Sequence, residues 1–193
     1  TSNDRALELE KERQYRWSRA RAFMEQRGLD ALLIFGSDRS DRYDAGQYLT
    51  YDRRYQQLIF PRQGDPTMIA FAAQVATQSM VEKERGNISW ISDIRTGYVP
   101  ELGPKILAEH GLTKGRLGVI GAGWGGPFFR NGWVPGQLWA AVEAALPGWE
   151  MVSVTQEFGA LMAVRSPFDR ENLARAAAAG DAAIEAMMAV ARP

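Results

Sequence analysis

The chain has 193 residues, of which 46% are hydrophobic, a length that suits one compact domain with a substantial core. Its 23 Lys and Arg balance 23 Asp and Glu, so no overall field favours a nucleic acid or an anionic membrane, and neither is expected as a partner. The absence of cysteine excludes disulfides, thiolate metal sites and a cysteine nucleophile.

The first part of the chain predicts a helix followed by a central strand. Residues 4–27 are rich in charge, and Gly28 stands where a helix needs a left-handed stop. The apolar residues of this segment recur at helical spacing: Trp17, Ala20, Phe23 and Met24. The nearly continuous apolar run at 30–35 predicts a strand that is covered on both faces.

The remainder predicts a hairpin and then alternating helices and strands. The turn-rich connector at 61–66 is too short for anything except a hairpin. We predict further strands at 57–60, 67–71, 88–91, 117–120 and 151–154. We predict further helices at 74–84, 101–110, 135–146, 156–163 and 169–191. This order indicates a mixed sheet between helical layers.

The last predicted helix is rich in alanine and ends at Arg192 and Pro193 without a capping glycine. It is either a terminal arm of this domain or a helix that packs against something larger, and we favour an architecture that continues beyond the chain. The first residues are polar, and no apolar run approaches the ~20 residues of a membrane helix. We therefore expect a soluble, cytoplasmic protein without an export signal.

Few residues are candidates for catalysis or metal binding. The single histidine, His110, adjoins a glycine stop and is typical of a helix C-terminal cap. One histidine cannot form a zinc site built from histidines, and it barely allows a serine triad. The loop residues Asp38, Asp41 and Asp44 are spaced suggestively but alternate with arginines and lack the calcium-loop pattern. We expect no catalytic residue, no metal site and no cofactor in this chain.

The segment Gly121–Gly126 satisfies the pattern G-x-G-x-x-G after a predicted strand. A dinucleotide site requires a helix to begin inside the motif, so that its free N–H groups face the pyrophosphate. Here the next predicted helix begins only near Val134. We favour a wide glycine loop, and keep a self-contained nucleotide-binding or small-ligand-binding module as the alternative function. A pure scaffold is a third hypothesis.

Four segments, in order, resemble the amino-terminal domain of the creatinase, prolidase and Xaa-Pro aminopeptidase family. They are Gly28–Phe35 after an arginine-rich helix, Tyr48–Thr50, Arg116–Val119 and Ala163–Pro167. In the family the last segment is the hinge into a catalytic domain, and it precedes an alanine-rich helix with an aspartate. Arg165, Asp169 and Asp181 occupy the corresponding places here, although relatives usually have lysine at the first and glutamate at the second.

The resemblance implies a three-layer α/β/α fold with a mixed five- to six-stranded sheet of ribonuclease-H-like topology. It implies an amino-terminal domain at 1–164, and the hinge and first helix of an absent catalytic domain at 165–193. That catalytic domain would hold two divalent metal ions and hydrolyse a C–N bond in a proline peptide or a creatine-like compound. The amino-terminal domain of relatives is non-catalytic, contributes to homodimer contacts and closes the partner subunit's substrate cleft.

Two groups of residues are candidates for that role. Tyr51, Arg53, Arg54 and Tyr55 resemble a segment that reaches into the neighbouring subunit, where an arginine would clamp a substrate carboxylate. The alternative is a solvated loop before the hairpin, and Tyr51 stands where most relatives have glycine. A second candidate surface comprises Trp124, Phe128, Phe129 and Trp133. These side chains either form a protein interface or belong to the core.

Overall fold

The computed structural model describes residues 2–36, 45–52, 57–70, 72–84, 90–122 and 134–191. Its helices are α1 (Ser2–Arg27), α2 (Ala45–Thr50), α3 (Ala73–Glu84), α4 (Val99–Glu109), α5 (Gly136–Ala145), α6 (Thr155–Ala163) and α7 (Pro167–Val190). Its strands are β1 (Ala31–Phe35), β2 (Gln57–Pro61), β3 (Thr67–Ala70), β4 (Asp93–Thr96), β5 (Gly115–Ile120) and β6 (Trp149–Ser153).

The six strands form one mixed sheet in the order β4-β3-β2-β1-β5-β6. The strands β1, β2 and β3 pair antiparallel, with Leu33 opposite Ile59. The strands β5 and β6 extend the sheet in parallel from β1, and β4 adds a parallel strand beside β3. This order confirms the expected α/β fold with a mixed sheet, and the antiparallel hairpin predicted from the turn at 61–66.

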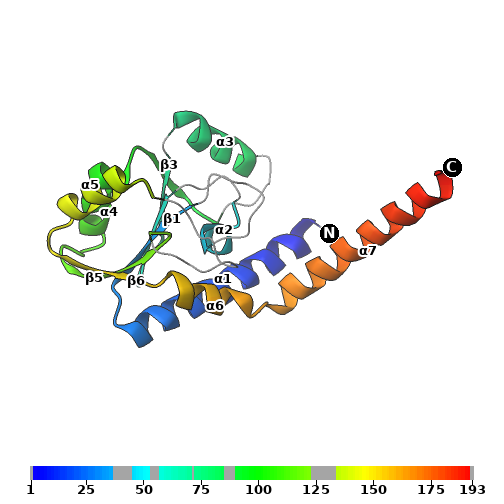
Figure 1. Ribbon diagram of the computed structural model, residues 1–193, viewed down its shortest axis with the longest axis horizontal. Coiled ribbons are helices and arrows are strands. Elements are labelled where there is room, and N and C mark those ends of the chain that lie inside the picture. The colour runs from blue at the N-terminus through cyan, green and yellow to red at the C-terminus, as the bar shows by residue number, and fades with distance from the viewer. Residues whose placement is uncertain are drawn as a thin grey trace.

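The sheet is covered on both faces, because successive side chains of each strand point in opposite directions. In β1, Leu32 and Ile34 face α1, α2 and α6, whereas Leu33 and Phe35 face α4 and α5. Figure 1 shows these two helical layers on either side of the strands. All five side chains of β1 are buried, as the continuous apolar run at 30–35 predicted.

The amphipathic stripe of α1 lies against the first of these faces. Trp17, Ala20, Phe23 and Met24 are all buried there, and the indole N–H of Trp17 donates to the carbonyl oxygen of Leu49 at 2.9 Å. The helix ends where Gly28 adopts a φ of 62°, a conformation that glycine takes without steric cost. The predicted helix, stripe and glycine stop are confirmed.

One predicted strand is wrong. The run at 88–91 was expected to pair, but in the described part of it Trp90 and Ile91 are buried outside the sheet, and β4 begins at Asp93. The β4 strand lies at a sheet edge and carries Asp93, Arg95 and Thr96, so its sequence lacks the apolar signal of a central strand. The short helix α2 was not predicted, since six residues are too few to show helical periodicity.

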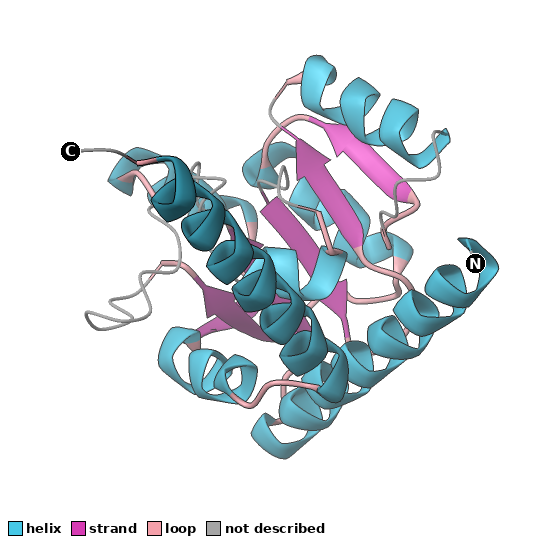
Figure 2. Ribbon diagram, turned by 90° about the vertical axis from the view of Figure 1, so that its right-hand side faces the viewer, coloured by secondary structure: helices cyan, strands magenta, loops and turns pink. Residues whose placement is uncertain are grey.

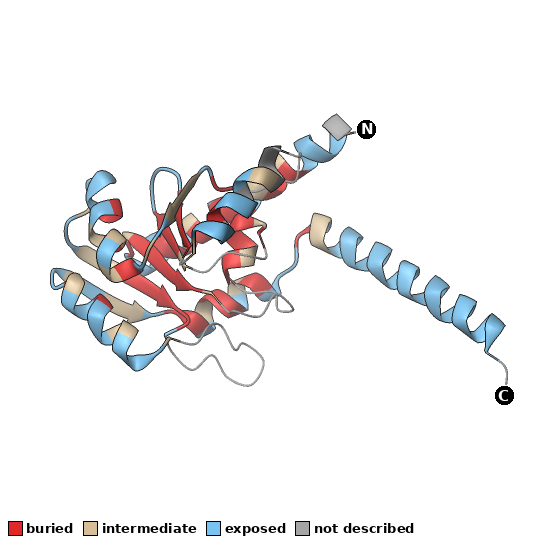
Figure 3. Cartoon of the chain, turned by 90° about the horizontal axis from the view of Figure 1, so that it is seen from above, coloured by how far each residue is buried: buried red, intermediate tan, exposed pale blue. Residues whose placement is uncertain are grey.

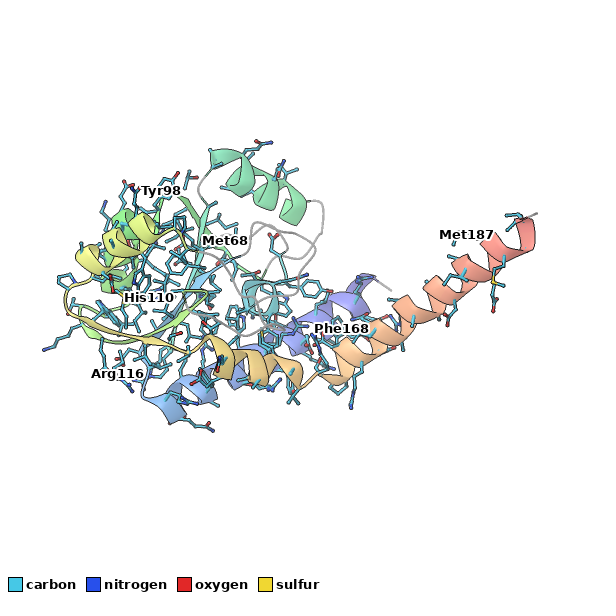
Figure 4. All side chains as sticks on the ribbon, viewed as in Figure 1. Met68, Tyr98, His110, Arg116, Phe168 and Met187 are labelled. Atoms are coloured by element: carbon cyan, nitrogen blue, oxygen red, sulfur yellow. The ribbon has the colours of Figure 1, made fainter. Side chains whose placement is uncertain are left out.

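The last helix, α7, projects away from the body of the molecule. In Figure 2, α7 lies nearest the viewer, in front of the strands, and Figure 3 shows α7 extending beyond the buried core. None of its residues is buried, and Met187 lies near its far end (Figure 4). No helix among the described residues has both the length and the apolar character needed to cross a membrane.

Candidate functional site

The most completely buried charge of the described chain is Arg16 in the middle of α1, which is 1% exposed. Its Nε donates to Glu12 Oε1 at 2.6 Å, one turn earlier on the same helix. Its Nη2 donates to Asp169 Oδ1 in the first turn of α7 at 2.8 Å, and its Nη1 to the carbonyl oxygen of Tyr48 at 3.2 Å. One guanidinium therefore connects α1, α2 and α7.

Ser166 closes the same cluster from the start of α7. Its hydroxyl donates to Glu12 Oε1 at 2.8 Å and accepts the backbone N–H of Asp169 at 2.9 Å. The second contact is an N-cap, which satisfies one of the free N–H groups at the start of a helix. We call Glu12, Arg16, Ser166 and Asp169 the α1–α7 joint. Because its charges are buried, removing one partner leaves another uncompensated.

Aromatic rings surround the guanidinium of Arg16. Its Cζ lies 5.0 Å from the ring centroid of Tyr48, 5.3 Å from that of Trp90 and 5.9 Å from that of Tyr51. Tyr51 stacks on Trp90 with centroids 5.2 Å apart, and Phe168 of α7 approaches Tyr51 at 6.4 Å. Figure 4 shows Phe168 where α7 leaves the body of the molecule. Cation–π attraction thus adds to the ion pairs that hold this helix.

Tyr51 has a φ of 57°, the only positive φ among the described residues other than glycine. It directly follows α2, and its N–H donates to the carbonyl oxygen of Gln47 at 2.9 Å, as in a left-handed helix end. Such a backbone costs a side-chain-bearing residue roughly 1–2 kcal/mol relative to glycine. The stacking of the Tyr51 ring on Trp90 opposes this strain.

Arg19 fastens the end of α6 to α1, one turn beyond Arg16. Its Nη2 donates to the carbonyl oxygen of Leu161 at 2.7 Å, and its Nη1 to that of Val164 at 2.9 Å. Its Nη1 also donates to the hydroxyl oxygen of Tyr48 at 3.3 Å. Burial raises the pKa of Tyr48 to about 12, so its hydroxyl stays protonated. The hinge between α6 and α7 is therefore held on α1 at both ends.

Of the residues predicted for substrate binding and for the interface, the structure describes only Tyr51. It is half-buried beside Trp90 and Phe168, next to the α1–α7 joint. The other members of that segment, Arg53, Arg54 and Tyr55, lie outside the described residues. The same holds for the predicted interface residues Trp124, Phe128, Phe129 and Trp133 and for the loop aspartates Asp38, Asp41 and Asp44.

The glycine loop at 121–126 is described only over its first two residues. Gly121 has a φ of 98°, and its N–H donates to Thr155 Oγ1 at 3.1 Å, which leaves that N–H engaged within the protein. The helix α5 begins at Gly136, close to the predicted position. His110 is the C-cap of α4 and is followed by Gly111 with a φ of 74°, as the sequence predicted.

Within the described ranges, no three side chains of His, Cys, Asp or Glu gather in an arrangement that would hold a metal ion. The metal pair implied by the resemblance thus has no ligand set in this part of the chain. No step of metal chemistry is assigned to these residues. What the buried polar groups do instead is fix one helix to another.

Sequence reasoning noted Ser166 and Asp169 only as a hinge motif and missed their partners Glu12 and Arg16. The signal was present in α1. Glu12 and Arg16 follow Leu9 and precede Ala20 at spacings of three and four residues, so both charges lie on the buried face of the helix. A charged pair inside an apolar stripe predicts a buried polar partner.

The fold and the joint define a three-layer α/β domain whose projecting C-terminal helix is anchored by buried ion pairs. The chain belongs to the creatinase/prolidase N-terminal domain family, whose model matches residues 16–165. A search of curated protein sequences finds no match to this chain.

Solved structures support the same fold at low sequence identity. A Xaa-Pro aminopeptidase from Streptococcus pyogenes is 15% identical with a TM-score of 0.51, over 76% of this chain and 94% of that one. An X-Pro aminopeptidase from Thermotoga maritima is 14% identical with a TM-score of 0.61, over 84% and 41%. Dipeptidase PepE from Mycobacterium ulcerans is 20% identical with a TM-score of 0.58, over 95% and 45%. The chain thus matches less than half the length of the last two relatives.

Proposed function

We propose that this chain is the non-catalytic amino-terminal domain of a metal-dependent C–N hydrolase of the Xaa-Pro aminopeptidase, prolidase or creatinase type. It holds the catalytic domain in place, pairs with a second copy of itself and closes the partner subunit's substrate site. The observation that carries the proposal is the α1–α7 joint. Buried charges in α1 fix the direction of a helix that has no buried residue of its own.

The family match supports a boundary at the hinge. The matched region ends at residue 165, and α7 begins at Pro167. The larger chains of the Thermotoga and Mycobacterium relatives continue well beyond the length matched here. We place the amino-terminal domain at 1–164 and assign 165–193 to the hinge and first helix of the catalytic domain, which would hold the two divalent ions.

The exposed apolar residues of α7 support a covering partner. Leu173, Ile184, Met187 and Met188 are each more than half exposed on this helix. An isolated helix is marginal in water, and most helices gain their stability from packing an apolar face. In the proposal the catalytic domain covers this face, and the joint sets where that domain lies relative to the sheet.

Hydrolysis assays on residues 1–193 test the absence of catalysis. We expect no cleavage of a Xaa-Pro dipeptide in the presence of Mn²⁺, Co²⁺ or Zn²⁺, and full cleavage by the longer protein that includes the catalytic domain. Turnover by residues 1–193 alone would refute the assignment.

Asp169→Asn in the longer protein is expected to lower kcat/KM while metal content stays at the wild-type value, because the variant loosens the joint and leaves the metal ligands intact.

Mixed dimers test whether Tyr51, Arg53, Arg54 and Tyr55 act on the neighbouring subunit. In the longer protein, Arg53→Ala with Arg54→Ala is expected to raise KM. Pairing that variant with a subunit that lacks metal ligands but keeps both arginines is expected to restore activity. Failure of every mixed dimer would exclude action in trans.

Sedimentation equilibrium of Trp124→Ala and Trp133→Ala variants tests the second part of the proposal, that the aromatic loop contributes to the dimer.

A further inference from the structure

A surface groove of about 690 Å³ runs along α1 on the side away from the α1–α7 joint. One wall is the face of α1 from Arg13 to Glu25, and the other is the turn after β2, with Arg62 and Asp65. Twelve helical steps correspond to a length of about 18 Å. Neither the fold nor the proposed function uses this groove.

Arg21 lies at the floor of the groove with an incompletely compensated charge. Its Nη2 donates to the carbonyl oxygen of Gly64 at 2.6 Å. Its Nε is buried and finds no hydrogen-bond partner among the described residues. Burial lowers the pKa of the Arg21 guanidinium, Asp65 partly opposes this, and the positive charge of Arg13 lowers it further. Buried polar groups in proteins are nearly always paired, so the unpaired Nε leaves Arg21 with hydrogen-bonding capacity that the described residues do not satisfy.

Two further guanidinium groups line the same groove. Arg13 stacks over the ring of Trp17 at 4.6 Å, while its ion pair with Glu10 lies beside the groove. The Arg62 side chain is 42% exposed, and its one ion pair with a described residue is a weak contact at 3.4 Å from Nη2 to Asp30 Oδ1. Three arginines thus face one groove, with room for planar carboxylate groups to form charge-assisted pairs.

We propose that this groove binds an extended acidic peptide segment, with carboxylates contacting Arg21 and Arg62. The length of the groove suits about six extended residues. Glu25 and Asp65 also line it and would repel a continuous polyphosphate chain, whereas a peptide carries carboxylates only at chosen positions. The balanced charge of the whole chain disfavours a nucleic acid in the same way.

The test uses two fluorescein-labelled peptides of about six residues, one alternating glutamate and serine and the other alternating glutamine and serine. Anisotropy titration of residues 1–193 is expected to give saturable binding of the glutamate peptide alone. Arg21→Gln and Arg62→Gln are each expected to raise Kd about tenfold or more, since each removes a charge-assisted hydrogen bond. Arg62 lies on an exposed turn, so that variant tests the site without disturbing the core.

The matched control is Arg27→Gln, which removes an exposed arginine of the same helix outside the groove, and which we expect to leave Kd within about twofold. An equal effect of Arg27→Gln, or equal binding of the two peptides, would overturn the proposal. So would displacement of the peptide by millimolar inorganic phosphate, or self-association that Arg62→Gln abolishes without any peptide binding, because these outcomes identify a different occupant. None of these results depends on peptidase activity in the longer protein.

Discussion

Two Arg–Glu pairs of the chain share the same spacing on a helix and differ strongly in burial. Arg16 pairs with Glu12 at 2.6 Å, and Arg175 pairs with Glu171 at 2.5 Å, each four residues apart. The Arg16 side chain is 1% exposed, whereas that of Arg175 is 67% exposed. Exposed pairs of this kind contribute about 0.3–0.5 kcal/mol, because water solvates both charges once they separate.

We therefore expect Arg16→Met to lower the free energy of unfolding by about 3 kcal/mol or more, because Glu12 is left buried without its cation. Arg175→Met is expected to change it by less than about 0.5 kcal/mol. Urea denaturation of both variants of residues 1–193, followed by circular dichroism, measures the difference. Similar small effects in both variants would show that Arg16 is not a buried anchor.

At Tyr51, backbone strain and ring packing act in opposite directions. Replacement by alanine keeps the φ near 57° for a residue with a Cβ and removes the stack on Trp90. Replacement by glycine also removes the ring but relieves the strain. We expect Tyr51→Ala to be less stable than Tyr51→Gly by about 1 kcal/mol, in the same denaturation assay. The reverse order would mean that this position carries no left-handed strain.

At the scale of elements, hydrophobic periodicity predicted the long and buried segments and failed where an element is short or polar. The stripe of α1 and the apolar run of β1 were predicted because their buried residues are apolar and recur at helical or strand spacing. The β4 strand has no such run, since ion pairs hold its Asp93 and Arg95 at the sheet edge. The α1–α7 joint depends on Arg16 meeting Asp169, 153 positions away, which no local pattern encodes.

The ion pairs of β4 predict a pH dependence. Burial alone would raise the pKa of Asp93, but hydrogen bonds from Arg95 and Thr67 outweigh it, and nearby His110 also lowers it, so the net shift is downward. Arg95 likewise lowers the pKa of Glu109 on α4. A carboxyl group with a lowered folded-state pKa stabilises the fold above its unfolded value of about 4 and loses that contribution as the pH falls.

We accordingly expect the unfolding free energy to fall as the pH decreases below about 5, and Asp93→Asn to flatten part of this decline. Urea titrations at a series of pH values measure it. Asp181→Asn, which removes an exposed carboxylate of α7, serves as the control and should leave the profile unchanged. An Asp93→Asn profile that parallels the wild type would exclude the ion pair between Asp93 and Arg95 as a source of this pH dependence.

Substitutions at two glycines test whether β5 is tightly packed and α7 is open to solvent, as the structure indicates. A Cβ at Gly118 would lie 2.7 Å from Leu32 Cδ2 and 2.8 Å from Leu29 Cδ1, whereas one at Gly180 would meet nothing within 4 Å. We expect Gly118→Ala to cost about 1–3 kcal/mol of global stability through overpacking. Gly180→Ala should instead raise helical ellipticity and hydrogen-exchange protection in α7, with a gain of about 1 kcal/mol in local helix stability. Equal effects on global stability would contradict this distinction.

At the scale of the whole molecule, the sheet and its two helical layers form one stable body, and α7 depends on that body only through its first turn. The sequence predicted the layered architecture because alternating strands and helices leave few ways to cover a sheet. For the last helix it left two alternatives, a terminal arm of this domain or a helix that packs against something larger, because an alanine-rich composition suits either. The contacts of Ser166, Phe168 and Asp169 distinguish the anchored turn from the rest of the helix.

Two truncations separate the contribution of the α1–α7 joint to stability from that of the exposed remainder of α7. A chain that ends at Arg175 keeps the joint and the N-cap, and residues 176–191 are all exposed, so its unfolding free energy should differ from that of the whole chain by less than about 1 kcal/mol. A chain that ends at Met162 loses Ser166 and Asp169, leaves Arg16 short of a carboxylate, and should lose about 3 kcal/mol or more. Thermal and urea unfolding of the two chains provide the comparison. If the longer truncation product were as unstable as the shorter one, α7 would have to contact the body beyond its first turns, and the joint would not be what holds it.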